Sequence, residues 1–155
     1  MITTPLTGAR AQVFNLITPY LQQGITSDER ARSDMLTVLI KVYASGGENR
    51  MHAHVLEDHT FIVLEGEARF HLDSDDNVRI LKPYEGVMLP KGSYYRFESV
   101  GEGNLVMLRV GAAPPGSPKQ AVYPEGNEKS RDQEPYGRVA RVEAPGQPFG
   151  EVSAR

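Results

Sequence analysis

Residues 52–66 read HAHVLEDHTFIVLEG, and this stretch decides both the expected fold and the candidate site. It contains three of the chain's four histidines, His52, His54 and His59. Residues two apart in a β-strand point to the same face, so His52 and His54 would aim two imidazoles at one space from Cα atoms about 6.5–7 Å apart. His59 has the opposite parity, and we expect it to join them through a bend within residues 55–58.

The second half of the stretch predicts a β-hairpin and indicates which of its faces is buried. With a two-residue loop at Glu65-Gly66, Phe61 would pair with Phe70, and directly opposed residues share a face. The predicted apolar face consists of His59, Phe61, Val63, Ala68, Phe70 and Leu72. His59 would then lie at the rim of the interior, whereas His71 would point outward and take no part in the site.

Short apolar runs separated by turn signals continue on both sides of this stretch. The run from Met35 to Tyr43 is rich in β-branched residues and ends at Ser45-Gly46-Gly47. Further strands are expected at Met51 to Val55, His59 to Leu64, Glu67 to Asp73, Val78 to Leu81, Gly86 to Leu89, Tyr94 to Glu98 and Leu105 to Val110. Many short strands at nearly regular spacing, with no long helix, are typical of an all-β sandwich or barrel.

The first 34 residues are mixed in character, and we expect residues 1–34 to pack on a barrel formed by residues 35–110. Val13 to Ile17 could form a short strand. Thr18 to Gln23 is predicted as a turn or a short helical piece, and Ser27 to Ser33 as a loop or a single helical turn.

Residues 111–155 differ in composition from the rest, because prolines and glycines punctuate a polar sequence. They are expected to form either a partly ordered tail or an arm that packs along the barrel or a neighbouring subunit. Within them Arg138 to Glu143 alternates polar and apolar residues, which would suit an added edge strand.

Composition narrows the class of protein. The 155 residues suit one domain, and the net charge of −3 without a basic run gives no reason to expect a nucleic-acid or membrane partner. The absence of cysteine excludes disulfides and thiolate ligands. The chain shows no apolar leader at Met1 to Arg10 and no apolar run of membrane-spanning length, so we expect a cytoplasmic protein.

Three imidazoles at the opening of an apolar interior favour a site for one divalent transition metal. Imidazole suits Fe, Zn, Ni, Mn or Cu, and three protein ligands leave coordination positions open for a substrate or O₂. Four apolar residues would wall the adjoining pocket: Phe61, Val63, Phe70 and Phe97. The competing interpretation is that hydrogen bonds satisfy the histidines and that the four residues are plain barrel core.

Two segments resemble the motifs of the cupin family. Gly46, five residues, His52-Ala53-His54 and then Phe61 to Gly66 resemble the first motif, and Leu89 to Phe97 resembles the second. The resemblance implies a double-stranded β-helix (jelly-roll-like) barrel with an extended Pro/Gly-rich C-terminal arm, a homodimer, and a metal at the barrel mouth. It carries over His52 and His54 directly as ligands.

Two ligand positions differ from the family's pattern. His59 stands where the family has glutamate, and imidazole is itself a good ligand. Tyr95 stands where the second motif has histidine, and it could bind the metal as a phenolate, donate a hydrogen bond to bound water or substrate in a catalytic role, or pack as a barrel aromatic. Glu57 and Asp58 could orient an imidazole or be solvated turn residues.

The resemblance favours a metalloenzyme that acts on a small organic molecule. A three-histidine site is similar to that of iron-dependent dioxygenases that cleave thiols or diketones, and metal-assisted isomerases, lyases and cyclases form a second group. The alternative is a non-catalytic small-molecule-binding or sensing module. A third possibility is an accessory barrel that acts through its dimer surface and arm, so the sequence leaves open whether the protein is an enzyme.

Overall fold

The computed structural model describes residues 9–44, 49–118, 120–125 and 139–152, and in these ranges all regular structure is β. The strands are β1 (Leu21–Gln23), β2 (Asp28–Arg32), β3 (Leu36–Tyr43), β4 (Ala53–His54), β5 (Asp58–Glu65), β6 (Glu67–Leu72), β7 (Val78–Leu81), β8 (Gly86–Leu89), β9 (Tyr95–Val100), β10 (Leu105–Ala112), β11 (Ala121–Val122) and β12 (Val142–Glu143). The all-β prediction is confirmed, and β3 to β10 fall at the runs predicted from Met35 to Val110.

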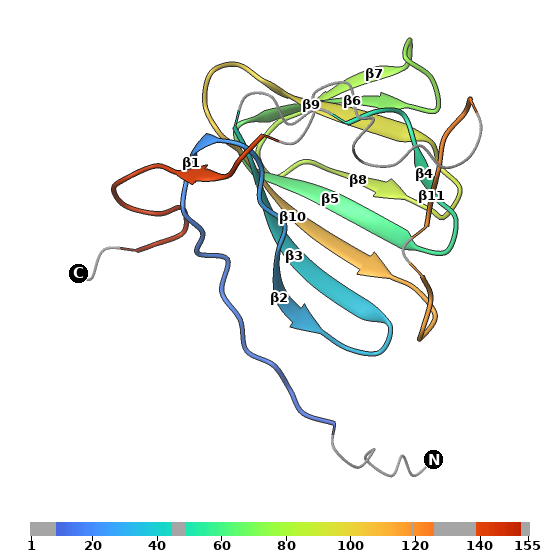
Figure 1. Cartoon of the computed structure of the whole chain (residues 1–155), viewed down its shortest axis with the longest axis horizontal. Helices are drawn as coiled ribbons and strands as arrows, with labels where there is room; N and C mark the ends of the chain where they lie inside the picture. Colours follow the sequence, from blue (N-terminus) through green and yellow to red (C-terminus); the bar gives the residue numbers. More distant parts are fainter. Residues whose placement is uncertain (1–8, 45–48, 119, 126–138, 153–155) are drawn as a thin grey trace.

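Two antiparallel sheets face each other and form the barrel (Figure 1). One has the strand order β2-β3-β10-β5-β8 and the other β7-β6-β9. Strand β5 alternates buried and partly exposed residues along most of its length, as a strand with one face on a core should. The core between the sheets contains Tyr43, Phe61, Val63, Ala68, Phe70, Leu89, Tyr95, Phe97, Leu105 and Met107.

A second apolar cluster covers the outer face of the larger sheet. It consists of Leu21, Ile40, Val42, Ala44 and Val106, with Leu16, Tyr20, Leu64 and Phe149 packed against it. The Asn104 side chain, directly before β10, links the barrel to β1. It accepts a hydrogen bond from the Leu21 amide at 2.7 Å and donates one to the Leu21 carbonyl at 2.9 Å. Segments from both ends of the chain therefore pack on the barrel's outside.

The predicted β5–β6 hairpin is wrong. Strand β5 pairs with β10 and β8, and β6 pairs with β7 and β9, so Gly66 carries the chain from one sheet to the other. Gly66 has φ +80°, and a Cβ there would lie 2.6 Å from the Asn104 carbonyl oxygen. The predicted inward side chains are nevertheless buried except Leu72, which is partly buried, because parity along a strand does not depend on which strand is its partner.

Three expectations for the N-terminal segment also need correction. Residues 13–17 form no strand. The next residue, Thr18, makes an isolated β-bridge with Phe149. The predicted turn or helical piece contains β1, and the predicted loop contains β2, an edge strand of sequence DERAR. This polar strand has little apolar alternation, and it forms because β3 offers an open edge.

The C-terminal arm packs along the barrel in the part that the structure describes. Strand β12 pairs with β1, which agrees with the predicted edge strand at its Val142–Glu143 end, whereas Arg138 lies outside the described residues. Strand β11 pairs with β4 at the other end of the molecule (Figure 1).

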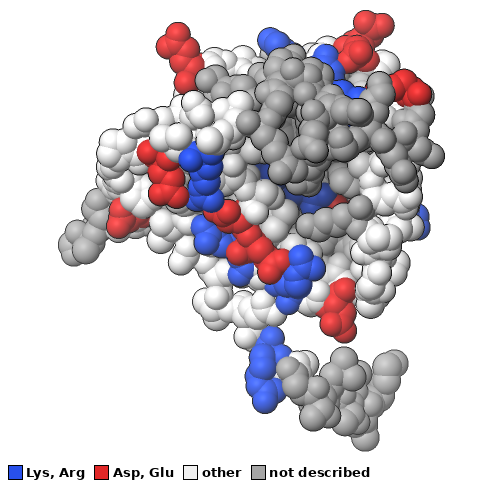
Figure 2. Space-filling model, in the orientation of Figure 1, with Lys and Arg blue, Asp and Glu red and all other residues white. Residues whose placement is uncertain are grey.

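Charges are mixed on the surface. Acidic and basic side chains are interspersed on the face shown in Figure 2, and the described residues there form no extended area of one sign. Ion pairs contribute to this pattern, such as Arg32 with Glu29 at 2.6 Å and Arg141 with Asp28 at 3.3 Å. Among the described residues, no helix is long and apolar enough to cross a lipid bilayer.

Candidate metal centre

Strand β4 ends at His54, His52 comes directly before it, and this short segment is held along both of its edges. On one side the backbones of His52 and Tyr95 exchange two hydrogen bonds, of 3.0 and 2.9 Å, and the Gly92 amide donates to the His54 carbonyl at 2.8 Å. On the other side β11 pairs Ala121 with His54. The two imidazoles thus come from a short extended segment whose backbone is hydrogen-bonded to neighbours on both sides.

The structure brings the three predicted imidazoles together. The ring centroids of His52 and His54 are 5.1 Å apart, and those of His54 and His59 are also 5.1 Å apart. The bend expected before His59 is present, because β4 ends at His54 and β5 begins at Asp58. His71 lies apart from the three, with its nitrogens 2.9 Å from the Asp75 carbonyl and 3.3 Å from Glu98, and it is buried at 7% exposure although the sequence predicted an outward position.

The hydrogen bond made by His52 fixes which of its nitrogens can bind a metal. Its Nδ1 lies 2.7 Å from the backbone carbonyl oxygen of Arg50, and a carbonyl can only accept. In the neutral ring Nδ1 therefore carries the hydrogen and Nε2 carries the lone pair. This is the usual way in which a metal-binding histidine is oriented by a neighbouring group.

His59 is the most unusual group in the cluster. Its side chain is buried, and neither ring nitrogen makes a hydrogen bond. Burial above all, and then the positive charge of Arg109 and the nearby His54 and His52, lower the pKa of His59 to about 2, against an opposing effect of the Glu57 backbone. The ring is therefore a neutral base, and buried polar atoms without partners call for an explanation.

An ion pair that the sequence did not reveal lies beside His59. The guanidinium of Arg109, on the inward face of β10, donates to the carboxylate of Glu57, whose Oε1 is also 3.6 Å from His59 Nδ1. Gly111 makes room for this pair, since a Cβ there would lie 2.9 Å from both side chains. The one sequence signal was an arginine inside the otherwise apolar run from Leu105 to Val110.

Tyr95 faces the cluster and is almost fully buried, with 2% of its surface exposed. Its ring centroid is 4.5 Å from that of His52 and 5.2 Å from that of His59. Burial raises the pKa of Tyr95 above the ordinary value near 10, so its phenol keeps its proton in the metal-free protein. Of the other two neighbours considered, Glu57 contacts the site, whereas Asp58 accepts a hydrogen bond from the Lys91 amide.

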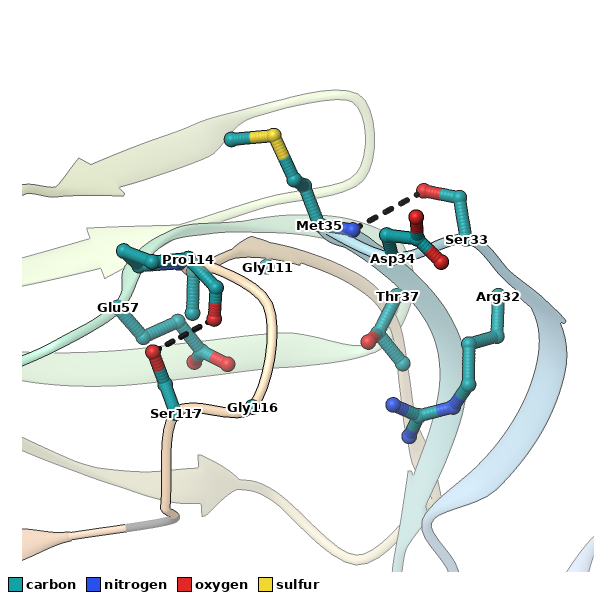
Figure 3. A pocket seen from close by; sticks show the side chains of 11 residues that line it. Arg32, Ser33, Asp34, Met35, Thr37, Glu57, Gly111, Pro114, Gly116 and Ser117 are labelled. Carbon is teal, nitrogen blue, oxygen red and sulfur yellow. Dashed lines mark hydrogen bonds between the residues drawn. The ribbon is translucent and has the colours of Figure 1, made fainter. Parts of the chain in front are cut away.

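The four predicted pocket residues lie in the core behind the histidines. Phe61, Val63, Phe70 and Phe97 are at most 1% exposed, and the ring centroid of Phe61 is 5.5 Å from that of His59. A separate cavity of about 110 Å³ lies nearby between residues 32–37 and 113–117 (Figure 3). Glu57 and Gly111 line it, so the cavity reaches the Glu57–Arg109 pair next to His59.

Whether these side chains suit a metal ion depends on their arrangement and on their chemistry. Within the described ranges, no group of three or more His, Asp or Glu side chains is arranged so that it could hold one ion. Two observations still favour the fit: the unpartnered nitrogens of buried His59 and the tautomer of His52. The neutral imidazoles are the form of histidine that binds metals.

The two facing sheets define the chain as a double-stranded β-helix barrel with histidines gathered at one place in its interior. Residues 39–111 match the Cupin_2 family, the cupin domain. A comparison with curated proteins finds no match.

Solved structures similar to this one have the same fold. A protein with a double-stranded β-helix domain from Klebsiella pneumoniae is 19% identical with TM-score 0.58, over 77% of this chain and 100% of that one. KdgF from Halomonas sp. is 17% identical with TM-score 0.54, over 60% and 82%. The Cnp3 cupin domain of Schizosaccharomyces pombe is 16% identical with TM-score 0.54, over 60% and 67%. At such identities the likeness concerns the fold alone.

Proposed function

We propose that this cupin binds one divalent transition metal through His52, His54 and His59 and acts on a small organic molecule at that ion. The observation that carries the proposal is His59, a buried neutral imidazole without a hydrogen-bond partner, whose ring is 5.1 Å from that of His54. A metal ion would give this ring the partner that the protein does not supply. When bound, the ion would supply Lewis-acid or redox chemistry.

The residues around the proposed ion would hold it and prepare the site. The Arg50 carbonyl keeps the Nδ1 hydrogen of His52 away from the ion, which leaves Nε2 as the donor atom. The Arg109 guanidinium lies close enough to His59 to oppose its protonation, which favours the metal-binding form. Burial of the His59 ring against Phe61 excludes water from one side of the site.

For Tyr95 we propose the role of a hydrogen-bond donor. A neutral phenol is a poor metal ligand, and burial raises the pKa of Tyr95, which works against phenolate formation. The hydroxyl of a protonated phenol can donate to a substrate anion or to water in the site. Direct ligation by Tyr95 remains the competing role, and the two differ in the metal content expected after removal of the hydroxyl.

Metal analysis of the purified protein and its variants tests the proposal. We expect about one metal ion per chain in the wild type, a strong loss in His59→Ala and in His52→Ala, and full content in Tyr95→Phe. His71→Ala is the matched control, because this histidine is similarly buried but bonded elsewhere. Retention of metal by His59→Ala would show that the proposed ligand set is wrong.

Turnover assays then separate the possible reaction classes. Substrate-dependent O₂ uptake with Fe(II) would favour a dioxygenase, whereas turnover with Zn(II) and no O₂ would favour a metal-assisted isomerase, lyase or cyclase. Tight binding of a small molecule without turnover would favour a binding or sensing module. The homodimer implied by the family resemblance stays a prediction, which light scattering of the purified chain would check.

A further inference from the structure

The segment Gln120–Glu125, which we call the strap, lies against the metal-binding strand β4 (Figure 1). Ala121 pairs with His54 and Val122 pairs with Ala53. Ala53, between the two histidines, is only 1% exposed. A strand of two residues has little stability of its own, so the backbone position of β4 depends on its neighbours on both edges.

Side chains of the strap reach the group that orients His52. The Arg50 guanidinium lies over the Tyr123 ring at 4.3 Å from its centroid, and Arg50 Nη1 is 3.5 Å from Glu125 Oε1. The backbone carbonyl of the same Arg50 accepts the hydrogen bond from His52 Nδ1. The Tyr123 ring is itself 6.3 Å from the His52 ring, measured between centroids.

We propose that the strap is a working part of the metal centre and that Tyr123 is a positioning residue. Tyr123 holds Arg50, and Arg50 in turn holds the ring of His52, while β11 keeps β4 in place and covers it. The strap lies beyond residues 39–111, the part that matches the cupin domain, so this chain completes its site with a segment outside that domain. The inference rests on the proposed metal function.

The first test measures how firmly the protein holds a probe metal, Co(II), and the absorption spectrum of the bound ion. Tyr123→Ala should release Co(II) to a chelator about tenfold faster than the wild type and shift the spectrum, as expected when a group that orients a ligand is lost. Tyr123→Phe keeps the ring that stacks on Arg50, so it should behave like the wild type. Tyr84→Ala is the control, because Tyr84 is 89% exposed and outside the site.

Unchanged release and an unchanged spectrum in a folded Tyr123→Ala would overturn the inference. The Phe variant makes the test specific, since a general loss of stability would not be restored by the ring alone. Thermal unfolding of each variant shows whether it is folded before the metal is added.

The second test needs no metal and therefore separates the strap from the proposed function. Diethyl pyrocarbonate acylates accessible neutral imidazoles, and mass spectrometry gives the rate at each histidine. Val122→Pro replaces the amide of a paired strap residue, so His54 should react several-fold faster than in the wild type, with His71 unchanged.

The outcomes of the two tests are distinguishable. If the wild type binds no Co(II), the metal function fails, and equal acylation of His54 in wild type and variant would then overturn the strap's covering role as well. If Val122→Pro does not fold, the acylation rates of Tyr123→Ala against Tyr123→Phe decide the question. If the wild type binds Co(II) but the acylation and metal-release rates are equal in all variants, the proposed role of the strap fails while the metal function stands.

Discussion

Replacing Glu57 with glutamine should destabilise the metal-free barrel, because it leaves the Arg109 charge without its counterion. The Arg109 side chain is 10% exposed and that of Glu57 is 22% exposed. Breaking a fully buried ion pair costs about 3–5 kcal/mol, and the partial exposure of Glu57 lowers our expectation to about 2–3 kcal/mol. For a chain of this length that corresponds to a fall in Tm of about 4–12 °C.

A double-mutant cycle separates the pair from other effects of the substitution. The variants are Glu57→Gln, Arg109→Met and both together, with the free energy of unfolding measured by urea titration. The double variant should be more stable than the sum of the two losses predicts, because it has no unpaired buried charge. The same cycle on Arg96 and Asp75 is the control, since Asp75 is 72% exposed and exposed pairs contribute about 1 kcal/mol or less.

Additive losses at Glu57 and Arg109 would refute this reasoning, because the two side chains would then not interact in the folded state. A loss below about 0.5 kcal/mol in Glu57→Gln alone would have the same meaning. Metal must be removed before these measurements, since any ion bound near His59 would stabilise the folded state by mass action.

Three further predictions concern stability. In the metal-free protein the pKa of His59 is near 2, against 6.5 for an unperturbed histidine, so between these pH values the unfolded state binds one more proton than the folded state. The free energy of unfolding should therefore fall by up to about 1.4 kcal/mol for each pH unit below 6.5. His59→Phe should flatten this pH dependence in urea titrations, and equal slopes in variant and wild type would contradict the prediction. Gly66→Ala should lower the free energy of unfolding by more than about 1–2 kcal/mol, because φ is +80° and the new Cβ would meet the Asn104 carbonyl. Gly103→Ala is the control: the space around Gly103 is open, so the change should stay within about 0.5 kcal/mol, as is usual for surface substitutions. Asn104→Ala should lose about 1–3 kcal/mol with its two hydrogen bonds to Leu21, measured by thermal unfolding, and an unchanged Tm would show that the contact is not stabilising.

The faces of the strands could be predicted from the sequence, whereas their partners could not. Alternation along β5 and β6 correctly placed Phe61 and Phe70 in the interior, since side-chain direction depends only on the strand's own parity. The hairpin was wrong because Glu65-Gly66 suits a tight turn within one sheet as well as a corner between two. The pairing of β5 with β10 decides between them. Its register joins residues that are between 41 (Glu65 with Val106) and 54 (Asp58 with Ala112) positions apart, and no local pattern carries that information.

Strand β2 shows the opposite failure, in which a real strand has no strand-like sequence. Its residues DERAR would suit a loop, but an edge strand needs one well-formed neighbour more than it needs apolar side chains. Charged residues on such an edge also discourage pairing with another chain, so the polar sequence has a physical use that a propensity argument does not detect.

The candidate site divides in the same way between local and distant contributions. His52, His54 and His59 lie within eight residues, and their convergence followed from strand parity and one bend. Arg109 and Tyr123 reach the same place from β10 and from the strap, through contacts that depend on the folded topology. The groups that set the protonation and orientation of the imidazoles are therefore the ones that the sequence concealed. It follows that two chains with the same histidine motif could differ in metal retention because of residues far from that motif, and the Tyr123 variants measure that difference directly.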